Sequence, residues 1–196
     1  MKKLIVSILM CLPVMAMAQN SWEEKTSSPD SKYLVGAVTL ENNIVTWRQT
    51  IDAPGKTKQE IYQRVKEWME ATAKEENQTE QSRVGGDEGR GTVIGRYQEW
   101  LVFKKTALVT DMTKFLYSLS VVCQDGKAEV KMTNLRYIYE EDRESGFSER
   151  AEMVITDEYG LKKNKQKLSR VYGRFRAKTI DRKDYLFGKL KEVITK

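Results

Sequence analysis

Residues 115–132 read FLYSLSVVCQDGKAEVKM, and this stretch decides the fold class. Apolar and polar residues alternate on both sides of Asp125-Gly126, a dipeptide typical of two-residue hairpin turns. Pairing residue 124 with residue 127 places three apolar pairs on one face: Cys123 with Ala128, Val121 with Val130, and Leu119 with Met132. Because the turn and the hydrophobic pattern predict the same register, the stretch indicates an antiparallel sheet. Beyond Thr133 the apolar phase changes, which predicts a bulge or bend.

The clearest helix is predicted for residues 58–74. Thr57 is a good N-cap, and Glu60 three residues later completes a capping box. One side of the helix carries the apolar stripe expected to pack on the sheet: Ile61, Val65, Trp68, Met69 and Thr72.

Further elements follow from the same patterns. We expect strands at 34–40, 44–51, 92–103, 151–156 and 171–177, with turn-rich or loop segments at 84–91 and 140–150. Four residues of the 92–103 strand are candidate core residues: Val93, Tyr97, Trp100 and Val102. A closing helix is expected after Asp181 as N-cap, burying Leu186, Phe187, Leu190, Val193 and Ile194. Two amphipathic helices separated by a meander predict an α+β fold with both helices on one face of a single sheet.

A family resemblance supports this fold. Residues 51–62, IDAPGKTKQEIY, resemble the strand, Pro-Gly and capped-helix entry of domain-of-unknown-function family 4468, a group of exported proteins of Bacteroides-type bacteria. Trp68, the segment 91–95 and the late apolar helix are also similar, and the resemblance covers residues 36–138 best. It implies a TATA-binding-protein-like (TBP-like) fold, in which helices pack on a curved antiparallel sheet. It supplies no catalytic residues and does not imply DNA binding, because one fold hosts many functions.

The N-terminus has the pattern of a secretory signal. Lys2 and Lys3 precede an apolar run at 4–14, and Ala16-Met17-Ala18 predicts cleavage before Gln19. The apolar run is shorter than the roughly 20 residues that span a bilayer. We therefore expect a signal peptide at 1–18, a flexible leader at 19–32 and one domain at 33–196. The mature protein is expected to be periplasmic or extracellular, with no transmembrane segment.

Composition excludes several kinds of chemistry. The chain has no histidine, which excludes Ser-His-Asp and Cys-His catalysis and metal sites built on imidazole. Cys123 is the one cysteine that remains after cleavage, and its place in a strand favours a buried thiol over a nucleophile. The net charge of +6 is spread along the chain, so we expect no nucleic-acid partner.

Two acidic motifs carry little weight. Gly85-Gly86-Asp87-Glu88 looks like the start of the diguanylate cyclase signature, but glycine follows where that signature needs an aromatic residue. The acids Glu140, Glu141, Asp142 and Glu144 lack the alternating spacing of a calcium loop, which favours a solvated loop. We therefore predict no catalytic residue, no metal site and no cofactor.

The aromatic residues give the remaining candidate site. Tyr137 and Tyr139 follow the phase change, so we expect them to face outward and to form a binding surface for sugar, peptide or lipid. The favoured hypothesis is a non-catalytic module that binds an envelope ligand or protein. The alternatives are a small hydrolase that uses carboxylates, and a structural or assembly component that self-associates through a strand edge.

Overall fold

The computed structural model describes Asn20 and residues 30–196. The predicted signal peptide, residues 1–18, and most of the predicted leader lie outside this part. The elements in chain order are η1 (Asp30–Tyr33), β1 (Leu40–Glu41), β2 (Ile44–Val45), β3 (Trp47–Asp52), α1 (Lys58–Thr72), β4 (Arg83–Asp87), β5 (Thr92–Lys105), β6 (Thr110–Gln124), β7 (Lys127–Tyr139), β8 (Phe147–Arg150), η2 (Ala151–Met153) and α2 (Gly173–Thr195).

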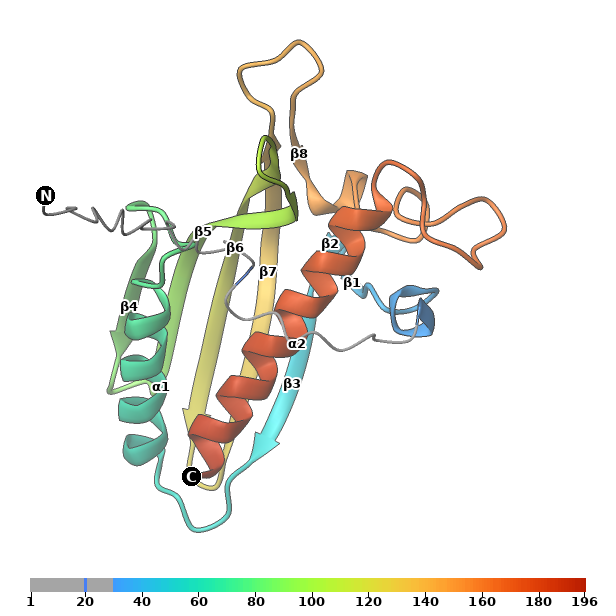
Figure 1. The fold of residues 1–196 in the computed structure, drawn as a ribbon. Helices are drawn as coiled ribbons and strands as arrows, with labels where there is room; N and C mark the ends of the chain where they lie inside the picture. The colour runs from blue at the N-terminus through green and yellow to red at the C-terminus, as the bar shows by residue number, and fades with distance from the viewer. Residues whose placement is uncertain (1–19, 21–29) are drawn as a thin grey trace, which may run out of the picture.

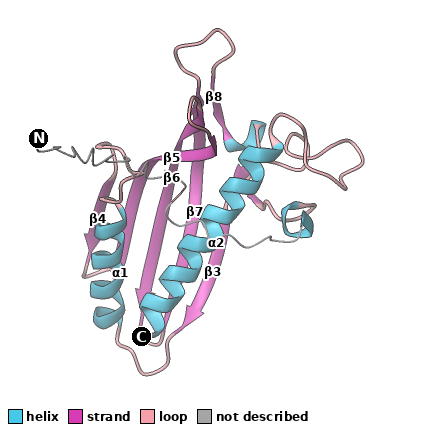
Figure 2. Ribbon diagram, in the orientation of Figure 1, coloured by secondary structure: helices cyan, strands magenta, loops and turns pink. Residues whose placement is uncertain are grey.

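One antiparallel sheet organises the described chain. Its strand order is β3-β7-β6-β5-β4, and β8 pairs with the far end of β7. Both α-helices lie on the same face of this sheet, α1 over the β4 side and α2 diagonally across the centre (Figures 1 and 2). The predicted α+β fold with two helices on one face is confirmed. None of the helices described here is long and apolar enough to cross a bilayer.

The β6–β7 hairpin has the predicted register. Cys123 pairs with Ala128, Val121 with Val130, and Leu119 with Met132, and all six side chains are buried. The predicted irregularity is also present, because the register shifts between Leu116 and Ser118. On the opposite strand Asn134 adopts a φ of 57°, which lets β7 change phase without leaving the sheet.

Helix α1 begins as its sequence predicts. The Thr57 hydroxyl accepts a hydrogen bond from the Glu60 amide, and the Glu60 carboxylate accepts one from the Thr57 amide. The buried stripe contains four of the five predicted residues, Ile61, Val65, Met69 and Thr72. Trp68 is only partly buried, because it lies at the groove between the two helices beside Val193.

The C-terminal helix is much longer than expected. Residues 173–177 belong to α2, so the predicted strand at 171–177 and the predicted N-cap at Asp181 are both wrong. The N-cap is Tyr172, and Asp181 lies within the helix, where it accepts a hydrogen bond from the Tyr33 hydroxyl. The prediction failed because Arg176 is buried, and a charged residue at a buried position hid the apolar period of the first turns.

Arg176 also explains two strands that do not form. Its guanidinium donates to the carbonyl groups of Tyr33, Leu34 and Ile155 at 2.5–2.6 Å. The segment 34–39, predicted as a strand, therefore turns at Gly36, whose φ is +84°, and β1 begins only at Leu40. The predicted strand at 151–156 is replaced by η2 and a turn, in which the carbonyl of Ala151 accepts two amide hydrogen bonds.

The phase of β5 differs from the prediction in its second half. Val93 and Tyr97 are buried as expected, whereas Trp100 and Val102 are only partly buried. Glu99 and Leu101 occupy the helix-facing side in their place, each with 0% exposure. The segments 84–91 and 140–150, predicted as turns or loops, also contain the short strands β4 and β8.

Candidate functional site

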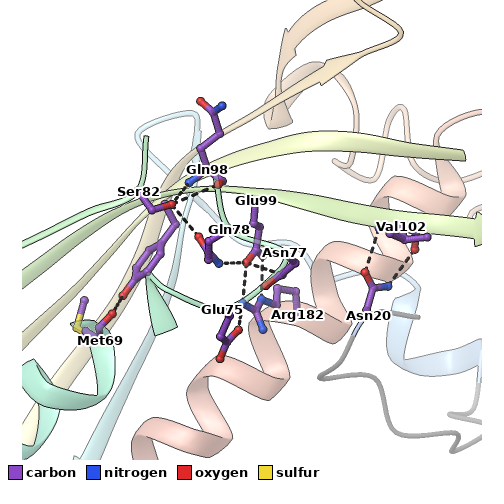
Figure 3. Close-up of polar contacts among 11 residues, drawn as sticks. Asn20, Met69, Glu75, Asn77, Gln78, Ser82, Gln98, Glu99, Val102 and Arg182 are labelled. Atoms are coloured by element: carbon purple, nitrogen blue, oxygen red, sulfur yellow. Dashed lines mark hydrogen bonds and ion pairs between the residues drawn. The ribbon is translucent and has the colours of Figure 1, made fainter. Parts of the chain in front are cut away.

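A buried ion pair lies between the sheet and α2. Glu99 of β5 and Arg182 of α2 are both fully buried. The Arg182 Nε donates to Glu99 Oε1 at 2.8 Å, and its Nη2 donates to Oε2 at 2.6 Å (Figure 3). This two-point geometry is the strongest form of arginine–carboxylate contact.

The segment after α1 closes over this pair. The side-chain amides of Asn77 and Gln78 donate to Glu99 Oε2, and the Glu75 carboxylate lies 3.4 Å from Arg182 Nη2 (Figure 3). Burial raises the pKa of Glu75, and the nearby Arg182 charge opposes that rise. Since the Glu99 carboxylate is fully buried and accepts hydrogen bonds from Asn77, Gln78 and Arg182, the cluster joins α2, β5 and residues 75–78.

Asn20 bonds to the main chain of β5 a few residues beyond Glu99. Its side-chain amide donates to the Val102 carbonyl at 3.0 Å and accepts from the Val102 amide at 3.1 Å (Figure 3). A single side chain thus occupies the place of a paired strand residue at the end of β5. Asn20 follows the predicted cleavage position, so the predicted mature chain would retain this contact.

The candidate ligand site is a groove of about 440 Å³ at the end of the sheet where β5 and β7 end and β6 begins. Its lining comes from β5, from residues 109–114 at the start of β6, and from the end of β7 with the turn that follows it. The lining residues are Trp100, Val109, Thr110, Asp111, Met112, Lys114, Ile138, Tyr139, Glu140, Glu141, Asp142 and Arg143.

The floor of the groove is a cross-strand row on the face that no described helix covers. Trp100 pairs with Lys114, and Lys114 pairs with Ile138, so their side chains share this face. The Lys114 ammonium lies 5.7 Å from the centre of the Trp100 ring and 2.8 Å from Glu141 Oε2. The Lys114 cation lies over the indole face, and the Glu141 carboxylate lies at the rim. The groove therefore offers apolar and charged contacts close together.

The start of α2 packs on the opposite face of the same strand ends, where the Tyr139 ring lies 5.5 Å from the Phe175 ring. The Tyr139 hydroxyl donates to Asp111 Oδ1 at 3.1 Å, and Arg174 donates to Asp111 Oδ2. The Arg174 guanidinium also lies 5.1 Å from the Tyr139 ring centre. Burial raises the pKa of the Tyr139 hydroxyl, with Arg174 opposing that rise. These contacts on the helix side hold the strand ends that carry the groove.

The two predicted binding residues have different positions. Tyr139 borders the groove and is half-buried, but its ring packs toward Phe175 of α2. Tyr137 does not face outward: it has 0% exposure, stacks on Phe115 at 5.3 Å and shares a 2.6 Å hydrogen bond with the Thr179 hydroxyl. The bulge opposite residues 116–118 turns Tyr137 toward α2, which corrects the expected outward position.

Sequence reasoning missed most of the groove. Glu140, Glu141 and Asp142 line it, although they were expected to be a solvated loop, and Lys114 was not singled out. The sequence analysis did single out one residue of the groove floor, Trp100, but assigned it to the core and not to the uncovered face.

The described part of the chain shows little reactive chemistry around the site. Within it, no group of three or more Asp, Glu or Cys residues could hold a metal ion. The Cys123 thiol is 1% exposed, and burial raises its pKa to about 11, as expected for a structural cysteine. Three carboxylates of the groove bind cationic partners: Asp111 binds Arg174, Glu140 binds Arg143, and Glu141 binds Lys114.

An open antiparallel sheet with two helices on one face and a groove at the loop end defines an α+β domain of the TBP-like class. A family model described as a domain of unknown function (DUF4468) with TBP-like fold matches residues 47–138. The crystal structure of a DUF4468 family protein from Bacteroides ovatus is similar, with 34% identity and a TM-score of 0.77, covering 85% of this chain and 95% of that one. The chain belongs to the DUF4468 family, and the resemblance seen in its sequence is confirmed.

A second solved structure is similar in fold. The crystal structure of a TBP-like protein from Parabacteroides distasonis has 16% identity and a TM-score of 0.63, covering 80% of this chain and 96% of that one. At this identity the likeness shows the fold alone. No curated protein matches the chain.

Proposed function

We propose that this protein is an exported, non-catalytic module that binds an envelope ligand, or a short segment of a partner protein, in the groove lined by Trp100, Lys114 and Glu141. The observation that carries the proposal is the arrangement of the groove floor. An indole face, an ammonium and a carboxylate lie together there on the uncovered sheet face. Sugars and peptide side chains combine apolar faces with hydrogen-bonding groups, and such a surface suits both.

The groove acids favour binding over hydrolysis. A general acid needs a carboxyl with a raised pKa near the substrate. Burial does raise the pKa of Glu75, but this residue contacts Arg182 in the closed cluster and does not line the groove. Asp111, Glu140 and Glu141 each bind a cation, which suits the recognition of polar groups more than proton transfer.

The binding proposal is tested by thermal-shift screening of residues 19–196 against cell-envelope glycans and peptides. A ligand at a hundredfold excess over its Kd should add about 2.7 kcal/mol of stability. We expect a hit that Trp100→Ala abolishes and that Trp68→Ala retains, because Trp68 lies in the separate groove between α1 and α2. A hit that Trp100→Ala leaves unchanged, or a flat screen with folded protein, would contradict the proposal.

Export has its own test. The full chain is expressed in a Gram-negative host, and the protein recovered from the periplasm is analysed by mass spectrometry. The predicted signal peptide requires a mature chain that begins at Gln19. An uncleaved chain in the cytoplasmic fraction would refute export by this signal.

A further inference from the structure

Strand β4 forms one outer edge of the sheet. Its inner side pairs with β5 from Arg83–Arg96 to Asp87–Thr92, and no strand of the described chain pairs with its outer side. Its residues 83 and 85–87 are exposed, and α1 lies over the neighbouring sheet face (Figure 1). Exposed edges of this kind can pair with another strand.

Neighbouring contacts show which groups face outward. On β5, the Trp100 amide donates to Asn77, and the Gln98 carbonyl accepts from Thr79. Even-numbered residues of β5 therefore direct their main-chain groups toward β4. Arg83, Gly85 and Asp87 face even-numbered partners and use their own main-chain groups inward. Since successive residues of a strand alternate, Val84 and Gly86 direct their amide and carbonyl groups to the free edge.

The sequence of this edge is complementary to itself. If two copies of 83–87 run antiparallel around a two-fold axis at Gly85, Val84 of one copy faces Gly86 of the other. These are the residues with outward main-chain groups, so the pair forms about four hydrogen bonds. Arg83 of each copy then faces Asp87 of the other, which joins opposite charges across the strands. Gly85 faces its own copy without any side chain to obstruct the approach.

We propose that β4 pairs with β4 of a second copy, so that two sheets become one continuous antiparallel sheet with a two-fold axis at Gly85. The main-chain geometry and the charges of β4 both favour a second copy of the chain as its partner. This proposal does not depend on the ligand groove. The paired strands are short and bury less than the roughly 1,200 Å² at the low end of stable interfaces. The dimer is therefore weak and depends on protein concentration.

Sedimentation velocity of residues 19–196, from micromolar to millimolar concentration, tests the proposal. The wild-type mass should rise from one chain toward two. Arg83→Asp and Asp87→Arg each place like charges opposite one another, so each should weaken dimerisation about tenfold or more. The double variant, Arg83→Asp with Asp87→Arg, restores opposite charges and should restore the dimer.

Arg170→Asp is the matched control, because it makes the same charge change as Arg83→Asp at an exposed position in the loop before α2. It should dimerise as the wild type does. Circular dichroism and the melting temperature verify that each variant is folded, since Asp87 also accepts a hydrogen bond from the Arg90 amide. The proposal is overturned if the wild type remains a single chain at millimolar concentration. It is equally overturned if folded single variants dimerise normally, or if the folded double variant does not dimerise.

Discussion

The Arg182 guanidinium contacts both oxygens of the Glu99 carboxylate, at 2.8 and 2.6 Å, in a place with no solvent exposure. The two residues are 83 positions apart and join the centre of α2 to β5. A buried charge that loses its partner is costly, so the pair favours the observed placement of the helix over the sheet. The pair therefore fixes how α2 is aligned on β5 and also stabilises the fold.

Arg182→Met should therefore destabilise the fold by about 3–5 kcal/mol, because it leaves the Glu99 carboxylate buried without its cation. Urea denaturation measures the change. The double variant Arg182→Met with Glu99→Leu removes both charges and should cost clearly less than the two single replacements added together. Strict additivity of the two changes would show that the residues are not coupled.

The same buried charges explain where sequence reasoning failed. Glu99 interrupts the alternation of β5, so Trp100 was predicted to be in the core although it faces the open side. Arg176 is buried in the first turns of α2 and interrupts their helical period, so these turns were predicted as a strand. Patterns of apolar residues assume that charges lie outside, and they mislead wherever an ion pair lies inside.

Elements defined by local chemistry were predicted well. The Asp125-Gly126 turn fixed the hairpin register, and the Thr57–Glu60 capping box fixed the start of α1. The groove could not be predicted in this way, because its residues come from three separate segments around residues 100, 112 and 140. Only the bend of β7 and the pairing of β6 bring them together.

The capping box gives a second prediction. Thr57→Ala removes the acceptor for the Glu60 amide and should lower the unfolding free energy by about 1 kcal/mol. Thr57→Ser keeps the hydroxyl and should restore most of that loss. Urea denaturation of both variants makes the comparison. Equal stability of the alanine and serine variants would show that the cap does not contribute.

Arg176 should hold two segments that are distant in sequence, 33–38 and 154–160, in their folded positions. Its guanidinium binds the carbonyls of Tyr33, Leu34 and Ile155 as well as the Asp157 carboxylate. Arg176→Met leaves these acceptors without their donor, at a cost of about 1–3 kcal/mol for each group that stays buried. Hydrogen exchange should therefore accelerate at 33–38 and 154–160, while the β6–β7 hairpin keeps its protection. Uniform acceleration across the whole chain would instead indicate global destabilisation.

Cys123 should make stability depend on alkaline pH. Burial raises the pKa of its thiol to about 11, above the unfolded value of about 8.5. The native state thus holds the proton more tightly, so the stability that the protonated thiol contributes is complete below about pH 8.5 and is lost as the pH rises toward 11, by roughly 3 kcal/mol in all. Cys123→Ala removes the thiol, and its stability difference from the wild type should shrink between about pH 8 and pH 10. A difference that stays constant in urea titrations across this range would show that the thiol does not titrate differently on folding.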